Sequence, residues 1–268
     1  MALSKRKKRL ILLLYALSAA LLTTIVVVLM VVLINQQNDF RHTFISRCEG
    51  FEGYDCKKLW KVFQQAYVGK SACKVPVEAY DPLLAEAPIQ PACNRMMFWS
   101  RSKQVVHDFT EKTDCFITLE DTLLGSVLDG LSWCGKENSK ETFTNNCPGW
   151  DECENNPVRS FWKKASAEYA HAACGGVTAM LNGSISPPYN SSSIFASVEV
   201  PRLNSTRVNS LTVVLVTQEN SVSNCTNGSF EVLQKDLDEG IKYKCKEVAL
   251  SWLQKCGSKP NPTCGPCW

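Results

Sequence analysis

LTVVLVT, residues 211–217, is the stretch that decides the fold class of this 268-residue chain. It is a nearly continuous run of β-forming residues, which is typical of a strand. VTAML at 177–181 and the alternating IFASVEV at 194–200 are also interpreted as strands. A polar helical segment near 230–239 and a short strand around 243–245 follow. Because helical or long connections separate the strands, we expect a small parallel sheet.

The residues before this sheet carry helical patterns instead. Apolar side chains recur at helical spacing over 57–67 and again over 119–131. Asn155-Asn156-Pro157 predicts a helix start, because asparagine caps a helix and proline suits its first turn. Gly175-Gly176 should end that helix. We therefore expect an α+β or α/β protein, with a helical N-terminal lobe joined to an α/β lobe that holds the small parallel sheet.

An uncharged apolar segment, residues 10–34, precedes both lobes. Its length exceeds the roughly 20 residues that cross a bilayer as a helix, and it is longer than the apolar part of a cleaved signal peptide. The basic cluster at 5–9 predicts a cytosolic N-terminus. We expect a single-pass type II protein of the plasma membrane, with a cytosolic tail at 1–9, a polar stalk at 35–47 and an extracellular domain at 48–268.

The cysteines indicate the same compartment. All 14 lie after the apolar segment, and an even number in an extracellular chain predicts a disulfide framework whose connectivity the spacing leaves open. A zinc site is not expected, given an oxidising compartment and three histidines. The net charge of +3 comes mostly from the cytosolic cluster, so nucleic-acid binding is not expected. N-glycosylation is expected at the N-x-S/T sequons Asn182, Asn190, Asn204, Asn224 and Asn227.

TLEDTLLG, residues 118–125, places two acids at the start of an apolar helical run. Thr118 and Asp121 are spaced like a capping box, and acids stabilise a helix N-terminus. Glu120 is not needed for that cap. On local grounds alone, helix initiation is still the favoured interpretation for either acid, and chemistry at Glu120 is the alternative.

Two further acids are candidates for a site. Asp129 lies nine residues after Glu120, which places it on the opposite face of an unbroken helix. Both acids can face one pocket only if the helix breaks, and Gly125 is the candidate for the break. Glu199 lies near the carboxyl end of the predicted strand 194–200, and α/β folds bind ligands at the carboxyl ends of strands. The alternative for Glu199 is an exposed acid on an edge strand.

Other signals are weaker. Trp99 and Trp162 are either core residues or stacking surfaces for a planar ligand. CGPC at 264–267 matches a redox tetrapeptide but lacks the helix that should follow it, so a structural bridge is favoured. The chain contains no G-x-S-x-G, G-x-G-x-x-G or Walker loop, so no nucleotide is expected to bind through those phosphate-binding turns.

Several motifs together resemble one known family. They are CNRMMFWSR (93–101), TLEDTLLG (118–125), SWCG (132–135), NNPVRSFWK (155–163), MLNGS (180–184) and SVEV (197–200). The chain resembles the ADP-ribosyl cyclase/cyclic ADP-ribose hydrolase family over about 48–256. Among the members of this family, it most resembles the type II leukocyte-surface NAD glycohydrolase. Because no apolar tail follows the final PTCGPCW, a glycolipid anchor is not expected.

The resemblance implies both a fold and an activity. A helical lobe and an α/β lobe would enclose a cleft in which the nicotinamide–ribose bond of NAD is cleaved. The products would be nicotinamide with ADP-ribose and cyclic ADP-ribose, and the cyclic product would itself be hydrolysed, which feeds calcium-mobilising signalling. NAD and cyclic ADP-ribose are then substrates, and neither a cofactor nor a metal is expected.

The resemblance also assigns residues. It implies that Glu199 is the catalytic glutamate and that Glu120 sets the balance between cyclisation and hydrolysis. The implied substrate-binding residues are Asp129 as a further pocket acid, Trp99 and Trp162 at the rings, and Ser100 and Arg101 near the phosphates. The chain departs from the family pattern at Gly130, at Ala196, and at Ile194, where an apolar wall would exclude water and favour the cyclic product.

The disulfide pairs implied by the resemblance are Cys48–Cys56, Cys73–Cys153, Cys93–Cys174, Cys134–Cys147, Cys225–Cys245, and Cys256 with either Cys264 or Cys267. Cys115 then pairs with the remaining C-terminal cysteine, stays free, or links two chains into a homodimer. A cell-surface receptor or adhesion protein with a vestigial site, bound to a protein ligand, is the alternative function. A paired-carboxylate glycosidase ranks third.

Overall fold

The computed structural model describes residues 15, 21–26, 39–113, 115–257 and 267–268. The predicted membrane segment 10–34 lies largely outside these ranges. The part of it that is described, Tyr15 and 21–26, is helical and exposed. Within the described ranges, the structure holds no helix with both the length and the apolar character needed to cross a bilayer.

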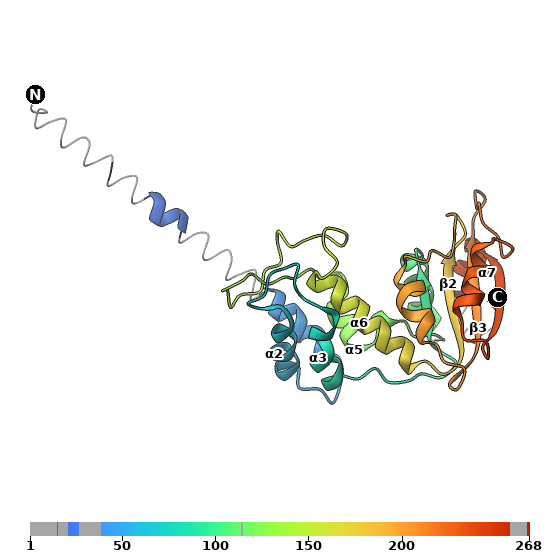
Figure 1. The fold of residues 1–268 in the computed structure, drawn as a ribbon, viewed down its shortest axis with the longest axis horizontal. Helices are drawn as coiled ribbons and strands as arrows, with labels where there is room; N and C mark the ends of the chain where they lie inside the picture. Colours follow the sequence, from blue (N-terminus) through green and yellow to red (C-terminus); the bar gives the residue numbers. More distant parts are fainter. Residues whose placement is uncertain (1–14, 16–20, 27–38, 114, 258–266) are drawn as a thin grey trace, which may run out of the picture.

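The N-terminal lobe is helical, as the 3.6-residue spacing predicts, and it forms the left part of the folded body in Figure 1. Buried aromatic rings fill its core, where Phe63 lies 5.2 Å from Trp133 and Tyr80 lies 5.5 Å from Phe161. Its elements are a helix at 39–48, α2 (Cys56–Tyr67), the 3₁₀ turn η1 (Val77–Tyr80), α3 (Asp81–Glu86), the 3₁₀ turn η2 (Leu119–Asp121), α5 (Leu123–Leu128) and α6 (Pro157–Ala172).

The helix at 39–48 changes one predicted boundary. Phe40 and Phe44 are buried, and the Phe44 ring lies 5.2 Å from both Trp60 and Phe63 on α2. Residues 39–47 therefore belong to the folded lobe and not to a polar stalk. The reason is that two phenylalanines one helical turn apart present a single apolar face, which packing against α2 removes from water.

The C-terminal lobe contains the predicted parallel sheet. Within the described chain it has four strands in the order β1 (Met97–Ser100), β2 (Gly175–Asn182), β3 (Val208–Thr217) and β4 (Lys242–Ala249), all parallel. The predictions for VTAML, LTVVLVT and 243–245 are confirmed as parts of β2, β3 and β4. The chain also forms α4 (Lys103–Thr113), α7 (Ser229–Asp236) and α8 (Leu250–Gly257), of which the sequence predicted α7.

Burial on both faces explains the continuous apolar run in β3. Leu211, Val213 and Leu215 point into the main core, whereas Val214 and Val216 join a second cluster under α4 and α8. Because successive side chains of a strand point to opposite faces, a strand covered on both sides needs apolar residues at every position.

The predicted strand 194–200 is wrong. Phe195–Glu199 is one turn of π-helix, and the 3₁₀ turn Val200–Arg202 follows it. The segment packs on α6 and β1 instead of pairing with a strand, and Phe195 is buried 6.1 Å from both Phe98 and Tyr189. These long-range contacts outweigh the local preference of β-branched residues for a strand.

Disulfide bonds join segments that are distant along the chain and close the C-terminus onto α8. Cys93–Cys174 joins the segments that enter β1 and β2. Cys256 pairs with Cys267, so the alternative pairing with Cys264 is wrong, and Cys264 itself lies outside the described residues. Cys115 is disulfide-bonded rather than free. The other pairs match those implied by the resemblance: Cys48–Cys56, Cys73–Cys153, Cys134–Cys147 and Cys225–Cys245.

Candidate active site

The TLEDTLLG segment forms two short helical pieces instead of one helix. The Asp121 carboxylate accepts hydrogen bonds from the Thr118 amide at 2.7 Å and from its hydroxyl at 2.8 Å, which confirms Asp121 as the capping acid. Thr122 then adopts an extended conformation and caps α5. The predicted break between Glu120 and Asp129 is present, but Thr122 makes it and not Gly125.

Gly125 has a different role, which is to let the backbones of α5 and η2 approach each other closely. A Cβ at this position would lie 1.9 Å from the Leu119 carbonyl oxygen, so α5 can fold back onto η2 only with glycine here. This packing leaves Glu120 buried in η2. Asp129 lies at the far end of α5, as its C-cap. Both acids face one cavity as a result.

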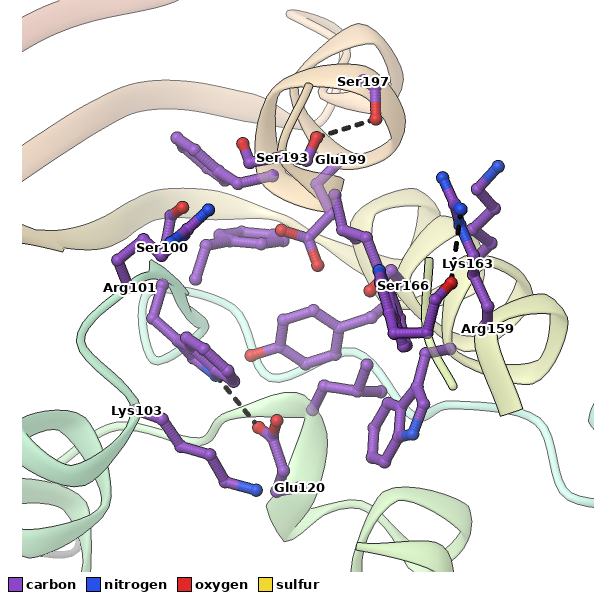
Figure 2. Close-up of a pocket in the computed structure, with 18 of the residues that line it drawn as sticks. Ser100, Arg101, Lys103, Glu120, Arg159, Lys163, Ser166, Ser193, Ser197 and Glu199 are labelled. Atoms are coloured by element: carbon purple, nitrogen blue, oxygen red, sulfur yellow. Dashed lines mark hydrogen bonds between the residues drawn. The ribbon is translucent and has the colours of Figure 1, made fainter. Parts of the chain in front are cut away.

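A cavity of about 870 Å³ lies between the helical lobe and the carboxyl end of β1. That volume is within the range of pockets that enclose drug-sized ligands. In Figure 2 the carboxylates of Glu199 and Glu120 point into this space from opposite sides. The cavity brings together all eight residues that the sequence singled out for a site: Trp99, Ser100, Arg101, Glu120, Asp129, Trp162, Ile194 and Glu199.

Glu199 lies in the wall of the cavity and is 7% exposed, so it is not an exposed acid on an edge strand. Burial raises the pKa of Glu199 to about 8, the Ser166 hydroxyl opposes that shift by hydrogen bonding, and the charge of Glu120 adds to it. A carboxyl group held in this way takes up and releases a proton near neutral pH, which is a property of acids that take part in reactions.

The opposite wall is built around Glu120. Trp99, at the carboxyl end of β1, donates its indole N–H to the Glu120 Oε2 atom at 3.2 Å. Arg101 follows with a positive φ of 57°, and its carbonyl accepts a hydrogen bond from the Asn182 side chain. Asp129 forms an ion pair with Lys103. Four charged groups of both signs therefore surround this end of the cavity.

Helix α6 supplies the third wall. The Asn156 side chain caps it by accepting the Arg159 amide at 2.9 Å, and Pro157 occupies the first turn, as the sequence predicts. Trp162 and Ser166, one turn apart, both line the cavity. A regular helix thus sets the distance between an aromatic face and the hydroxyl that contacts Glu199.

Sequence reasoning missed several residues of the site. Ser166 could have been found from its i+4 spacing to Trp162 on a predicted helix. Arg159 and Tyr169, on the same predicted helix, could have been found from their spacings of three residues before Trp162 and three after Ser166. No local pattern identifies Lys103, Trp150 or Lys163, because they reach the cavity only through tertiary packing. The missed lining residues are Lys103, Trp150, Arg159, Lys163, Ser166 and Tyr169, and His107 lies behind Glu120.

Known proteins share this chain's sequence and architecture. The model of the ADP-ribosyl cyclase family matches residues 37–265. Rat ADP-ribosyl cyclase/cyclic ADP-ribose hydrolase 1 is 34% identical over 229 residues, which cover 83% of this chain and 75% of the rat protein.

Solved structures agree with that match. Porcine CD38, complexed with a covalent intermediate described as ribo-F-ribose-5′-phosphate, aligns with a TM-score of 0.74 and 34% identity over 79% of this chain and 96% of its own. Aplysia cyclase, complexed with substrate NGD and product cGDPR, aligns with a TM-score of 0.72 and 31% identity over 83% and 94%. The chain therefore belongs to the ADP-ribosyl cyclase/cyclic ADP-ribose hydrolase family.

Proposed function

We propose that the chain cleaves the nicotinamide–ribose bond of NAD to give nicotinamide with ADP-ribose and cyclic ADP-ribose, and that it also hydrolyses cyclic ADP-ribose. Calcium-mobilising signalling is consistent with these products. The observation that carries the proposal is the buried Glu199 carboxyl, which faces Glu120 across a cavity of about 870 Å³. Family membership supports the reaction class. NAD acts as a substrate, and no separate cofactor is proposed.

The chemistry suits these side chains. Nicotinamide leaves as a neutral molecule from a cationic pyridinium, so the ribose carbon gains positive charge as the bond breaks. The ionised Glu199 carboxylate stabilises that charge or forms an ester with the ribose. The covalent intermediate described for porcine CD38 supports a covalent step of this kind. Trp99 and Trp162 would hold the rings by stacking, and Ser100 and Arg101 would lie by the phosphates.

Two nucleophiles then compete for the ribose. Water gives ADP-ribose, whereas the adenine N1 gives cyclic ADP-ribose, so exclusion of water favours ring closure. Glu120 and Asp129, on the wall opposite Glu199, are the acids proposed to bias this choice.

The Ile194→Thr substitution tests the water-exclusion argument, because Ile194 lines the cavity. A hydroxyl there admits water, so the ratio of cyclic to open product should fall about 3- to 10-fold. Chromatography of both products gives the ratio. Val232→Thr, at an exposed position on α7, is the matched control. An unchanged ratio in Ile194→Thr contradicts the role of this side chain.

The pKa of Glu199 predicts a pH profile. Because its carboxyl must be ionised to act and its pKa is raised to about 8, kcat/KM for NAD should rise with pH up to about 8 and then level off. Glu120→Gln removes a neighbouring charge that raises this pKa, so the midpoint should move to lower pH. A kcat/KM that is flat from acidic to alkaline pH contradicts this assignment.

We also infer a topology. Residues 10–34 would anchor the chain once in the plasma membrane, with 1–9 in the cytosol and the catalytic domain outside as a glycoprotein. The disulfide bonds support an oxidising compartment. Protease added to intact cells should remove the C-terminal region and spare the N-terminus. Protection of both ends would overturn this topology.

To test the activity, the purified full-length chain is incubated with NAD. Chromatography then resolves nicotinamide, ADP-ribose and cyclic ADP-ribose. Release of nicotinamide with both sugar products is the expected result. No release from a correctly bridged protein would favour the alternative, a cell-surface receptor with a vestigial site.

A further inference from the structure

His107 lies on α4, directly behind the wall that carries Glu120. Its Nε2 atom is buried and has no hydrogen-bond partner. That atom is 3.9 Å from the Glu120 Oε2 atom, and the two side chains are 18% and 8% exposed. A buried polar nitrogen without a partner is unfavourable by about 1–3 kcal/mol, so this arrangement calls for a role.

The Nε2 atom of His107 faces one acceptor, the Glu120 Oε2 atom. The Glu120 Oε2 atom that it faces already accepts the Trp99 indole N–H at 3.2 Å. The imidazole lies edge-on to the Trp99 ring, with centroids 6.4 Å apart and an angle of 66° between the planes. A contraction of about 1 Å would make Nε2 a second donor to the same carboxylate, and hydrogen bonds of this kind commonly tighten when a substrate fills the site.

The other charged groups near α4 are engaged with partners or exposed to solvent. Lys103 pairs with Asp129, and Asp108 accepts the Gln104 side-chain amide at 2.7 Å. Asp121 is held by Thr118, and Lys255 on the packed helix α8 is exposed, as are Glu111 and Lys112 on α4 itself. Strand β1 contributes no titratable side chain to this contact. Glu199 faces Glu120 from across the cavity.

We propose that His107 is a positioning residue for Glu120. In its protonated form the imidazole donates from Nε2 to the Glu120 carboxylate and holds this side chain against the Trp99 indole. Histidine changes its charge between about pH 5 and 8, so the partition between cyclic and open products becomes dependent on pH. This inference rests on the proposed function, because it concerns the choice between two products of that reaction.

Glutamine and phenylalanine separate this role from packing. A glutamine amide can place an N–H donor near the Nε2 position at every pH, whereas phenylalanine keeps the ring and removes both nitrogens. A side chain that only packs would be replaced better by phenylalanine. The full-length chain carries two other histidines, and exposed His171→Gln is the matched control.

The measurement is the ratio of cyclic to open product from NAD between pH 5.5 and 8.5. In the wild type and in His171→Gln, the ratio should change with pH by about 10-fold, the size expected for one charge-assisted hydrogen bond. His107→Gln should keep the acidic-pH ratio throughout. His107→Phe should keep the alkaline-pH ratio throughout.

Each other outcome contradicts the proposal in its own way. A pH-dependent ratio in His107→Gln that matches the wild type overturns it, even if His107→Phe does not fold. Loss of the pH dependence in His171→Gln assigns the effect to another histidine. Absence of nicotinamide from the wild type overturns the proposed function itself, and this inference falls with it.

Discussion

Replacing Glu199 with glutamine is expected to lower kcat for nicotinamide release by about 1,000-fold, the size found when a group that stabilises developing charge is removed. Glutamine keeps the shape of the side chain but carries no charge to stabilise the ribosyl cation, and it forms no ester. The measurement is single-turnover nicotinamide release, which separates chemistry from binding.

The same substitution should make the protein more stable above acidic pH. The pKa of Glu199 is about 8 in the folded protein and 4.5 as its reference value, so the folded state binds the proton more tightly. Stability of the wild type is therefore lost as pH rises between these values. By pH 7 the loss is about 3 kcal/mol, because the unfolded state has released this proton and the folded state still holds most of it. Glutamine mimics the protonated form and avoids this cost.

Thermal unfolding at several pH values tests this stability effect. The Tm of Glu199→Gln should equal that of the wild type near pH 4 and exceed it by about 6–12 °C at pH 7, because 1 kcal/mol shifts Tm by about 2–4 °C in a domain of this size. Exposed Glu239→Gln is the control and should leave Tm unchanged. An inactive Glu199→Gln protein with no gain in Tm would argue against a raised pKa at this site.

Gly125→Ala is expected to have the second large effect. The new Cβ would meet the Leu119 carbonyl oxygen at 1.9 Å, and that atom belongs to the backbone of the turn that carries Glu120. Overpacking against backbone costs about 3 kcal/mol, because no side chain can rotate away. We expect Tm to fall by about 6–12 °C. We also expect the product ratio to change, since α5 must move away from η2.

Gly228→Ala is the matched control for this prediction. A Cβ added at Gly228 would have no atom within 4 Å, and the backbone φ there is −57°, so alanine should be accepted without loss of stability. A Gly125→Ala protein as stable as Gly228→Ala, with the wild-type product ratio, would show that the packing of α5 on η2 does not hold Glu120 in place.

Some elements follow from short-range pattern. Asn156 and Pro157 start α6 through their own backbone preferences, and the apolar run in β3 forms a strand wherever both faces are covered. The Thr118–Asp121 cap also forms between neighbours three residues apart. Patterns of this kind succeed because the interacting atoms are close along the chain.

The resemblance contributed what pattern could not. Cysteine spacing left the connectivity open, and the pairs came from family motifs that the structure then confirmed, with Cys267 as the partner of Cys256. The roles of the site residues came from the same motifs. The structure brings those residues to one cavity, and their roles stay predictions.

The amino-acid sequence by itself determined the two-lobed α/β architecture, the parallel strands and the helix cap, because period and propensity act locally. Tertiary structure alone decided that Glu199 sits on a π-turn instead of a strand, and that its carboxyl is buried opposite Glu120. It also decided that His107 faces Glu120. The reason is that packing sets the distance between residues far apart in the chain. A local sequence pattern does not show which side chains this packing removes from water.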